Sequence, residues 1–255
     1  MKEKTNRKQP NKSFLIFIPV YNEASSITEI LGKVRKSTPT SEILVIDDGS
    51  TDSTPTLLKN EKNIHFIQHS QNEGYGKTLI DGFNFAINRK FDYIITLDSD
   101  EQHQPEEIIK FTKAVETEDR DIVSGSRYLQ KSRQKLNEAP EDRKKINNRI
   151  TQYINRITGY ELTDSFCGFK LYKVSSLKKL NLTEYGYGMP LELWMQAWKH
   201  RFKINEVPVD LIYLDKDSNQ TSSCKKVFRR YKYYLQIIEK EIKDYENISI
   251  SSPSR

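Results

Sequence analysis

Residues 14–23 read FLIFIPVYNE, an apolar run that changes abruptly to polar side chains. The run is short, contains Pro19 and ends at Tyr21-Asn22-Glu23, so we predict a fully buried strand over residues 14–20. It is also the longest apolar run of the chain, and a membrane-spanning helix needs roughly 18 or more such residues. The stretch therefore predicts a core strand that ends in a polar group, and no membrane span.

The same change from apolar to polar recurs along the first half of the chain. Further strands are predicted at residues 42–46, 63–69, 93–97 and 122–125, with helices at about 25–36, 51–60 and 106–116 and another ending near 88. Strands and helices that alternate at roughly 25-residue spacing are typical of parallel βαβ units with helices on both faces of the sheet. The expected fold is α/β, with a Rossmann-like, mostly parallel sheet.

Polar groups lie at or shortly after the ends of these strands. They are residues 21–23, Asp47-Asp48, residues 74–77 and residues 98–100. In open parallel sheets, ligands bind outside the carboxyl ends of the strands. We therefore expect the four groups to share one rim.

The pattern changes after residue 125. Residues 131–149 carry seven Lys/Arg against three acids, and an apolar group follows at 166–174. A helix is predicted near residues 191–200, a strand at 204–209 and a long helix from about 224 to 245. The expected organisation is a disordered basic tail at 1–12, one domain at 13–223, a basic amphipathic helix at 224–245 and a disordered tail at 246–255.

The composition is that of a globular protein with one large domain. The 255 residues include 30% charged and 36% hydrophobic side chains, and the formal net charge of +6 favours an anionic partner. Cys167 and Cys224 are the only cysteines, and they support neither a disulfide framework nor a zinc pattern. Because no apolar segment stands at a signal-peptide position, the expected location is the cytoplasm.

Asp98-Ser99-Asp100 is the sharpest local signal in the chain. Two carboxylates at the end of a buried strand repel each other and lose hydration, and a divalent cation relieves both costs. Oxygen ligands suit Mg²⁺ or Mn²⁺, and Gln102 offers a further neutral oxygen. On these residues alone, two interpretations stay open: a solvated acidic turn, or a metal site that offsets charge on a diphosphate leaving group.

Two other strand ends carry groups suited to a nucleoside. Asp48 can accept a hydrogen bond from a ribose or a base, while Tyr21 offers a ring to cover a base and Glu23 a second acceptor. The alternatives are a tight turn at Asp48 and an ordinary helix start after Tyr21.

The loop at residues 74–77, GYGK, lets backbone N–H groups approach a phosphate, or packs closely through its glycines. It has neither Walker A nor dinucleotide-binding spacing.

Positive charge is available at three places. Arg127 follows the last strand of the first half, where a guanidinium can bind phosphate bidentately. The run Arg143-Lys144-Lys145 adds charge, or forms a solvated helix face. The helix at 224–245 has an apolar face and a basic face, so it lies on an anionic bilayer or packs on the domain.

Taken in order, these segments resemble glycosyltransferase family 2, the inverting enzymes of GT-A fold. The resemblance runs from about residue 14 to about residue 235 and is carried by FIPVYNE, VIDDGSTDST, NEGYGKTLIDG, TLDSDEQHQP, SGSRY, DSFCGFKLY and INEVPV. SGSRY and DSFCGFKLY point to the dolichol- or polyprenyl-phosphate mannosyltransferase branch. The resemblance implies the GT-A nucleotide-diphospho-sugar transferase fold and Mg²⁺ or Mn²⁺ as cofactor.

The resemblance also implies roles for residues. Asp98, Asp100 and Gln102 would hold the metal and the diphosphate. Arg143 would lie near the acceptor phosphate, and Glu192 matches an acidic position close to the reacting sugar. The set implied for the donor and its surroundings is Pro19, Tyr21, Glu23, Ile46, Asp48, Asp98, Ser99, Gln102, Arg127 and Arg143.

The chain departs from the branch near its C-terminus. Related bacterial proteins carry a stretch like Asn-Arg-Ser-Phe-Gly after a tyrosine-containing strand, where this chain has YLDKDSNQT at residues 213–221. Asn219 stands where the arginine is expected, and Lys216 is its candidate substitute. The membrane-spanning C-terminal helices of some members are also missing from this sequence.

The implied reaction is one displacement at the anomeric carbon, from GDP-mannose or a UDP-sugar to a polyprenyl or dolichyl phosphate, with Asp100 and Arg127 as catalytic residues. If the acceptor is a saccharide hydroxyl, as in cell-surface polysaccharide synthesis, a carboxylate must take its proton, and Glu192 or Asp164 is the candidate. An alternative of another class is a nucleotide-sugar binding protein with no turnover. Contact with the cytosolic face of a membrane would use the helix at 224–245, and we expect no nucleic acid partner.

Overall fold

The computed structural model describes residues 12–100, 102–129, 141–210 and 224–251, with side chains from Lys144 in one long helix and from Val227 to Asn247 in another. The predicted disorder at 1–12 falls almost wholly outside these residues. The strands are β1 (Phe14–Val20), β2 (Glu42–Asp47), β3 (His65–Gln68), β4 (Tyr93–Thr96), β5 (Ile122–Ser126), β6 (Lys170–Lys173) and β7 (Ile204–Pro208). The helices are α1 (Ile27–Ser37), α2 (Thr54–Asn60), α3 (Tyr75–Asn88), α4 (Ile108–Thr117), α5 (Glu141–Thr158), α6 (Val174–Leu177), α7 (Met189–Lys199) and α8 (Cys224–Ser251), and a 3-10 turn spans Pro105–Glu107.

The strands form one sheet in the order β3-β2-β1-β4-β6-β5-β7. Every neighbouring pair is parallel except those of β6, which runs antiparallel to both β4 and β5. The predicted mostly parallel α/β sheet is therefore confirmed, and the elements predicted before residue 126 are present with ends shifted by at most three residues. The reversed β6 was not predicted, because a buried strand of four residues carries no sequence signal of its direction.

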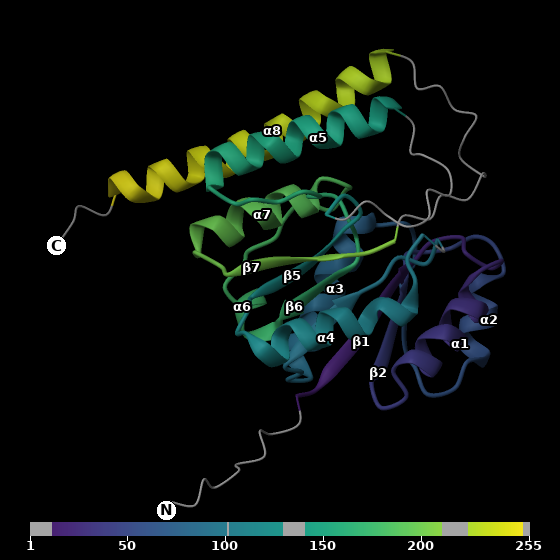
Figure 1. Cartoon of the computed structure of the whole chain (residues 1–255). Coiled ribbons are helices and arrows are strands. Elements are labelled where there is room, and N and C mark those ends of the chain that lie inside the picture. Colours follow the sequence, from purple (N-terminus) through teal and green to yellow (C-terminus); the bar gives the residue numbers. More distant parts are fainter. Residues whose placement is uncertain (1–11, 101, 130–140, 211–223, 252–255) are drawn as a thin grey trace, which may run out of the picture.

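Helices cover both faces of the sheet (Figure 1). Successive side chains of a strand point to opposite faces, and β1 divides accordingly. Leu15 and Phe17 pack in the cluster that contains α3, α5, α7 and α8, whereas Ile16 and Ile18 pack in the cluster that contains α1 and α4. The two clusters together form the core and hold the strand ends in a fixed row.

Helices α5 and α8 lie side by side and, with α7, form a layer over one end of the sheet (Figure 1). The charged run at 131–149 hid α5 from the sequence reasoning, although Ile146, Ile150 and Ile154 recur at helical spacing and are buried. Helix α8 begins at Cys224 as predicted but continues beyond Tyr245 to Ser251. No proline lies between Cys224 and Pro253, so no proline forces an earlier end of the helix.

The apolar face of α8 is covered by the protein. Tyr234, Ile237 and Ile238 are buried against the helices beneath, and Phe228 is the exception with 66% of its surface exposed. The helix thus packs on the domain, and its apolar stripe is not available to a bilayer. Among the described residues, no helix combines the length and the apolar character that crossing a membrane requires.

Gly82 in α3 and Gly32 in α1 form a matched pair that tests this packing. A Cβ at Gly82 would lie 2.2 Å from the buried ring of Phe17, whereas a Cβ at Gly32 would meet nothing within 4 Å. We expect Gly82→Ala to lower the free energy of unfolding by about 1–3 kcal/mol through overpacking. Gly32→Ala should raise it by up to about 1 kcal/mol, since alanine favours the helix. Urea denaturation measures both, and equal effects would contradict the packing described.

Candidate active site

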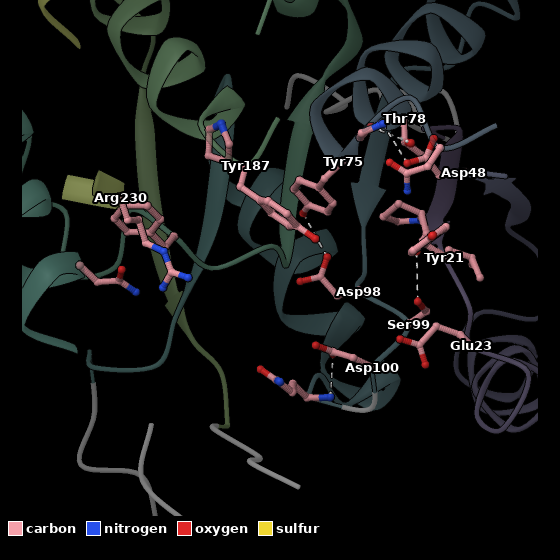
Figure 2. A pocket seen from close by; sticks show the side chains of 18 of the residues that line it. Tyr21, Glu23, Asp48, Tyr75, Thr78, Asp98, Ser99, Asp100, Tyr187 and Arg230 are labelled. Carbon is pink, nitrogen blue, oxygen red and sulfur yellow. Dashed lines mark hydrogen bonds between the residues drawn. The ribbon is translucent and has the colours of Figure 1, made fainter. Parts of the chain in front are cut away.

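A cleft of about 630 Å³ opens at the carboxyl ends of β1, β2 and β4, where the sequence predicted a shared rim. One wall, here called the sheet side, consists of Pro19, Val20, Tyr21, Glu23, Asp48, Asn72, Gly74 and Thr78. The opposite wall, here called the helix side, consists of Asn147, Phe166, Tyr187, Pro190, Arg230 and Tyr234. Tyr75, Asp98 and Asp100 lie between them (Figure 2). Ser99, Gln102 and Arg127 also line the cleft.

Hydrogen bonds tie the polar residues that follow β1 to neighbouring segments. The Ser26 hydroxyl lies 2.9 Å from a carboxylate oxygen of Glu23 and 3.0 Å from the carbonyl oxygen of Ser99. The Ser99 hydroxyl in turn donates to the carbonyl oxygen of Pro19. Tyr21 keeps 45% of its surface exposed, which leaves a ring face open on the sheet side.

Asp48 is held from three directions. Its Oδ1 accepts from a ring nitrogen of His69 at 2.8 Å and from the backbone N–H of Glu73 at 2.9 Å. Its Oδ2 accepts from the N–H of Gly74 at 3.0 Å. Gly49 turns the chain after Asp48 with a φ of +72°, so the tight turn and the oriented carboxylate occur together. Ile46 is fully buried in β2 and does not line the cleft.

The GYGK loop packs closely, as the second of its two interpretations required. A Cβ at Gly74 would lie 2.4 Å from the carbonyl oxygen of Tyr185, and one at Gly76 would lie 2.3 Å from that of Glu184. The Lys77 ammonium contacts both carboxylate oxygens of Asp81 at 2.6 Å, and Lys77 does not line the cleft. The glycines therefore let the residue 184–186 segment approach α3.

Asp98 and Asp100 lie at the centre of the cleft (Figure 2). Burial raises the pKa of both carboxyls, and the charge of Asp98 raises that of Asp100 further. The Tyr75 hydroxyl donates to Asp98 at 3.1 Å, and the N–H of Gln102 donates to Asp100 at 3.1 Å. Two half-buried acids whose ionisation is opposed by their surroundings form a setting that a divalent cation stabilises.

The donor set suits Mg²⁺ or Mn²⁺. Among the residues that the structure describes, no three His, Cys, Asp or Glu side chains gather as a metal site. The pair Asp98 and Asp100, with Gln102 beside it in the cleft, offers few protein oxygens. Mg²⁺ commonly takes one or two carboxylates and completes its shell with water and phosphate oxygens. These residues therefore fit a cation that arrives with a diphosphate.

Arg127 and Asp164 form a bidentate pair. Asp164 accepts from Nε of Arg127 at 2.6 Å and from Nη2 at 2.9 Å, and only 1% of its side chain is exposed. Burial on its own would raise the pKa of Asp164, but the charge and hydrogen bonds of Arg127 lower it overall. Arg127 lines the cleft and Asp164 does not, so the carboxylate orients the guanidinium.

The structure does not bring Glu192 into the cleft. Its carboxylate is buried in α7 and accepts from the N–H and hydroxyl of Thr183 and from the N–H of Glu184. Arg143 lies in the first turn of α5, and its side chain is outside the described residues. Lys216 and Asn219 are also outside them.

Sequence reasoning missed most of the helix side. Tyr187 is 74% exposed and stacks on Tyr75 with ring centroids 5.6 Å apart. Arg230 and Tyr234 come from α8, and Arg230 points toward the cleft from the side opposite Asp48 (Figure 2). The basic residues of α8 were visible in the sequence. Their position beside the cleft was not, because it depends on how α8 packs on α5 and α7.

The family comparison decides what kind of protein this is. Residues 15–181 match the family model described as "Glycosyl transferase family 2", and this segment holds the sheet side and both acids. The chain belongs to glycosyl transferase family 2. It is a glycosyltransferase enzyme, so the alternative of a binding protein with no turnover is set aside.

Relatives refine this assignment. The undecaprenyl-phosphate mannosyltransferase of Micrococcus luteus is 31% identical over 205 residues, which cover 78% of this chain and 83% of that protein. The UDP-N-acetylglucosamine–dolichyl-phosphate N-acetylglucosaminyltransferase of Methanococcus voltae is 28% identical over 223 residues, or 80% of this chain and 88% of that protein. This glycosyltransferase therefore belongs to the polyprenyl- and dolichyl-phosphate branch, as its motifs indicated.

A solved structure confirms the predicted GT-A fold of the glycosyltransferase. Glucosyl-3-phosphoglycerate synthase from Mycobacterium tuberculosis, solved with Mn²⁺, uridine diphosphate and phosphoglyceric acid, matches with a TM-score of 0.69. The match covers 90% of this chain and 78% of that chain at 13% sequence identity. The likeness lies in the fold.

His103, beneath the acids, provides a pH test of the site. Its ring is buried against Cys167 and accepts from the N–H of Asp98, and burial lowers its pKa from 6.5 to about 4. A folded-state pKa below the unfolded value stabilises the fold above pH 6.5, and this stabilisation is lost as the pH falls toward 4. Between pH 7 and pH 5 the loss from this group is about 2 kcal/mol.

The variant His103→Gln lacks this titrating group. From pH 7 to pH 5, we therefore expect the free energy of unfolding of the unchanged protein to fall by about 2 kcal/mol more than that of the variant. Urea denaturation at both pH values, with a chelator present, measures the difference. Parallel pH dependence in the two proteins would contradict a neutral, buried His103.

Proposed function

We propose that this glycosyltransferase moves a sugar from a nucleotide-diphospho-sugar, GDP-mannose or a UDP-sugar, to a polyprenyl or dolichyl phosphate. The observation that carries the proposal is the cleft with two chemically different walls. The sheet side offers carboxylates and an open tyrosine ring, whereas the helix side offers an arginine among aromatic rings. The names of the relatives in Micrococcus luteus and Methanococcus voltae support lipid-phosphate acceptors for this branch.

The sheet side suits the nucleoside of the donor. The open face of Tyr21 can cover a base, and Glu23 and Asp48 accept hydrogen bonds from a base or a ribose. The diphosphate then reaches Asp98 and Asp100 at the centre of the cleft. The relatives in Micrococcus luteus and Methanococcus voltae are named for mannose and N-acetylglucosamine transfer, so both sugars are candidates for the donor.

Asp98, Asp100 and Gln102 would hold Mg²⁺ or Mn²⁺. When bound, the cation supplies positive charge that stabilises the departing diphosphate. Arg127 adds a fixed positive charge at the same place, because Asp164 occupies its Nε and Nη2 and leaves Nη1 for phosphate oxygens. We propose one displacement at the anomeric carbon, with inversion, for which this arrangement supplies leaving-group stabilisation.

The helix side suits a phosphate attached to an apolar chain. Arg230 forms no ion pair with any residue that the structure describes, so its guanidinium is available to an anion. Phe166, Tyr187 and Tyr234 add aromatic surface to the same side of the cleft. A guanidinium binds a phosphate through charge-assisted hydrogen bonds, and the rings can contact the first isoprene units.

A saccharide hydroxyl as acceptor is the weaker candidate. It would need a carboxylate to take its proton in the cleft. Asp164 is occupied by Arg127, and Glu192 is occupied by Thr183 and Glu184 outside the cleft. A lipid phosphate is ionised at neutral pH and needs no base.

Because such an acceptor lies in a bilayer, we propose that the enzyme works at the cytosolic face of a membrane and that the exposed Phe228 and Arg229 of α8 face it.

The metal role is tested by Asp100→Asn. We expect sugar transfer in Mn²⁺ to fall roughly 100-fold or more, since a catalytic cation contributes several kcal/mol. Chelation of the unchanged enzyme should give a similar loss. Asp119→Asn, an exposed acid paired with Lys173 far from the cleft, is the matched control and should keep full activity. Transfer that persists in chelator would refute the metal role.

The acceptor role of the helix side is tested by Arg230→Gln. With a short, water-soluble polyprenyl phosphate, we expect the acceptor KM to rise about tenfold or more, while the donor KM stays unchanged, because a hydrogen bond to a charged group is lost. Arg229→Gln is the matched control, since Arg229 is the exposed neighbour that does not line the cleft. Equal acceptor KM values in the two variants would exclude Arg230 as the phosphate ligand.

A further inference from the structure

A chain of polar and ionisable side chains lies directly behind Asp48. Nδ1 of His69 is 2.8 Å from Asp48 Oδ1, and Nε2 of the same ring is 3.1 Å from Asp81 Oδ2. The Lys77 ammonium contacts Asp81 from the other side. Only 8% of the His69 side chain is exposed. Neither His69, Asp81 nor Lys77 lines the cleft, so this group can act on a ligand only through Asp48.

The Asp48 carboxylate already accepts three hydrogen bonds, so it can accept few more. A carboxylate oxygen accepts about two hydrogen bonds. Oδ1 already takes His69 and the N–H of Glu73, and Oδ2 takes the N–H of Gly74. One acceptor position therefore remains, on Oδ2, and the three existing donors fix its direction. Without the imidazole, the carboxylate would be held from the backbone of residues 73–74 alone.

The fold does not need this imidazole for sheet pairing. The backbone N–H of His69 already donates to the carbonyl oxygen of Asp47 at 2.9 Å, which joins the end of β3 to β2. His65, four residues earlier, offers a comparison. It also contacts a carboxylate, Glu42 at 2.6 Å, but it lies at an exposed part of the sheet and does not line the cleft. A histidine–carboxylate contact thus occurs once at the surface, between His65 and Glu42, and once behind the sheet side of the cleft, between His69 and Asp48.

We propose that His69 is a positioning residue for the nucleoside of the donor, which orients Asp48 while Asp81 and Lys77 fix the far side of the ring. The proposal rests on the proposed function, because it takes Asp48 as a nucleoside contact. His69 makes no contact with the diphosphate region or with the helix side. Its effect is therefore confined to donor affinity, and the chemical step and the acceptor are untouched.

Three substitutions separate the two contacts of the ring. In His69→Asn the amide nitrogen stands near the place of Nδ1 and can still donate to Asp48. In His69→Gln the amide stands near Nε2 and reaches only Asp81, and His69→Ala removes both contacts. We expect the Kd for UDP or GDP in Mn²⁺, measured by calorimetry, to rise about threefold to tenfold in the Gln and Ala variants. The Asn variant should stay within about twofold of the unchanged enzyme.

Two controls separate positioning from general damage. Inorganic pyrophosphate with Mn²⁺ reaches the acids but not Asp48, so its Kd should be the same in all His69 variants. His65→Asn should leave every Kd unchanged, and kcat should hold in all four variants. Equal losses for nucleotide and pyrophosphate, or nucleotide affinity unchanged in the Gln and Ala variants, would overturn the proposal. If the unchanged enzyme binds neither UDP nor GDP, the proposed function itself falls.

Discussion

Partial burial of the Asp98 and Asp100 carboxylates is the constraint on which the rest of the cleft depends. Burial raises the pKa of Asp98, and the Tyr75 hydrogen bond and the charges of Lys170 and Arg127 oppose that rise. Lys170 is itself buried, with its ammonium bonded to the carbonyl oxygen of Cys167 and 5.5 Å from the centre of the Trp194 ring. Positive charge therefore supports the acids from within the protein. On the solvent side of the two acids, the divalent cation proposed for this site would supply the positive charge.

Only the sheet side of the cleft lies wholly within the segment that matches the family model, because Asn147 and Phe166 are the two helix-side residues inside it. Every residue of the sheet side lies within the segment 15–181 that matches the family model, whereas Tyr187, Pro190, Arg230 and Tyr234 lie beyond it. The side proposed for the donor is thus part of the shared α/β core. The side proposed for the acceptor takes residues from α5, α7 and α8, which are held in place by packing rather than by sheet hydrogen bonds. Under the proposed function, relatives can therefore differ in acceptor while keeping the same strand ends.

The local sequence predicts most strands of the sheet and most residues of the sheet side of the cleft. Apolar runs that end in Asp or Tyr-Asn-Glu locate strand ends, and parallel topology brings those ends together. The sequence could not reveal which carboxylates are already occupied. Asp164 and Glu192 were both candidate bases from the sequence. In the structure, Asp164 accepts hydrogen bonds from Arg127, which is 37 residues away, and Glu192 accepts from Thr183, which is 9 residues away. The sequence also could not reveal that Arg230 lines the cleft, because the basic residues of a helix do not show which neighbouring helices it packs against.

Strand β6 has a consequence for where its flanking residues lie. A strand that runs against its neighbours begins, rather than ends, at the rim where they finish. The segment just before β6 therefore arrives at the cleft, with Asp164 beneath Arg127, Phe166 on the helix side and Gly168 against Asp98, where a Cβ would lie 2.0 Å from a carboxylate oxygen. One reversal in chain direction allows the five consecutive residues 164–168 to hold Arg127, line the helix side and pack against Asp98. A one-residue insertion there would disturb all three together.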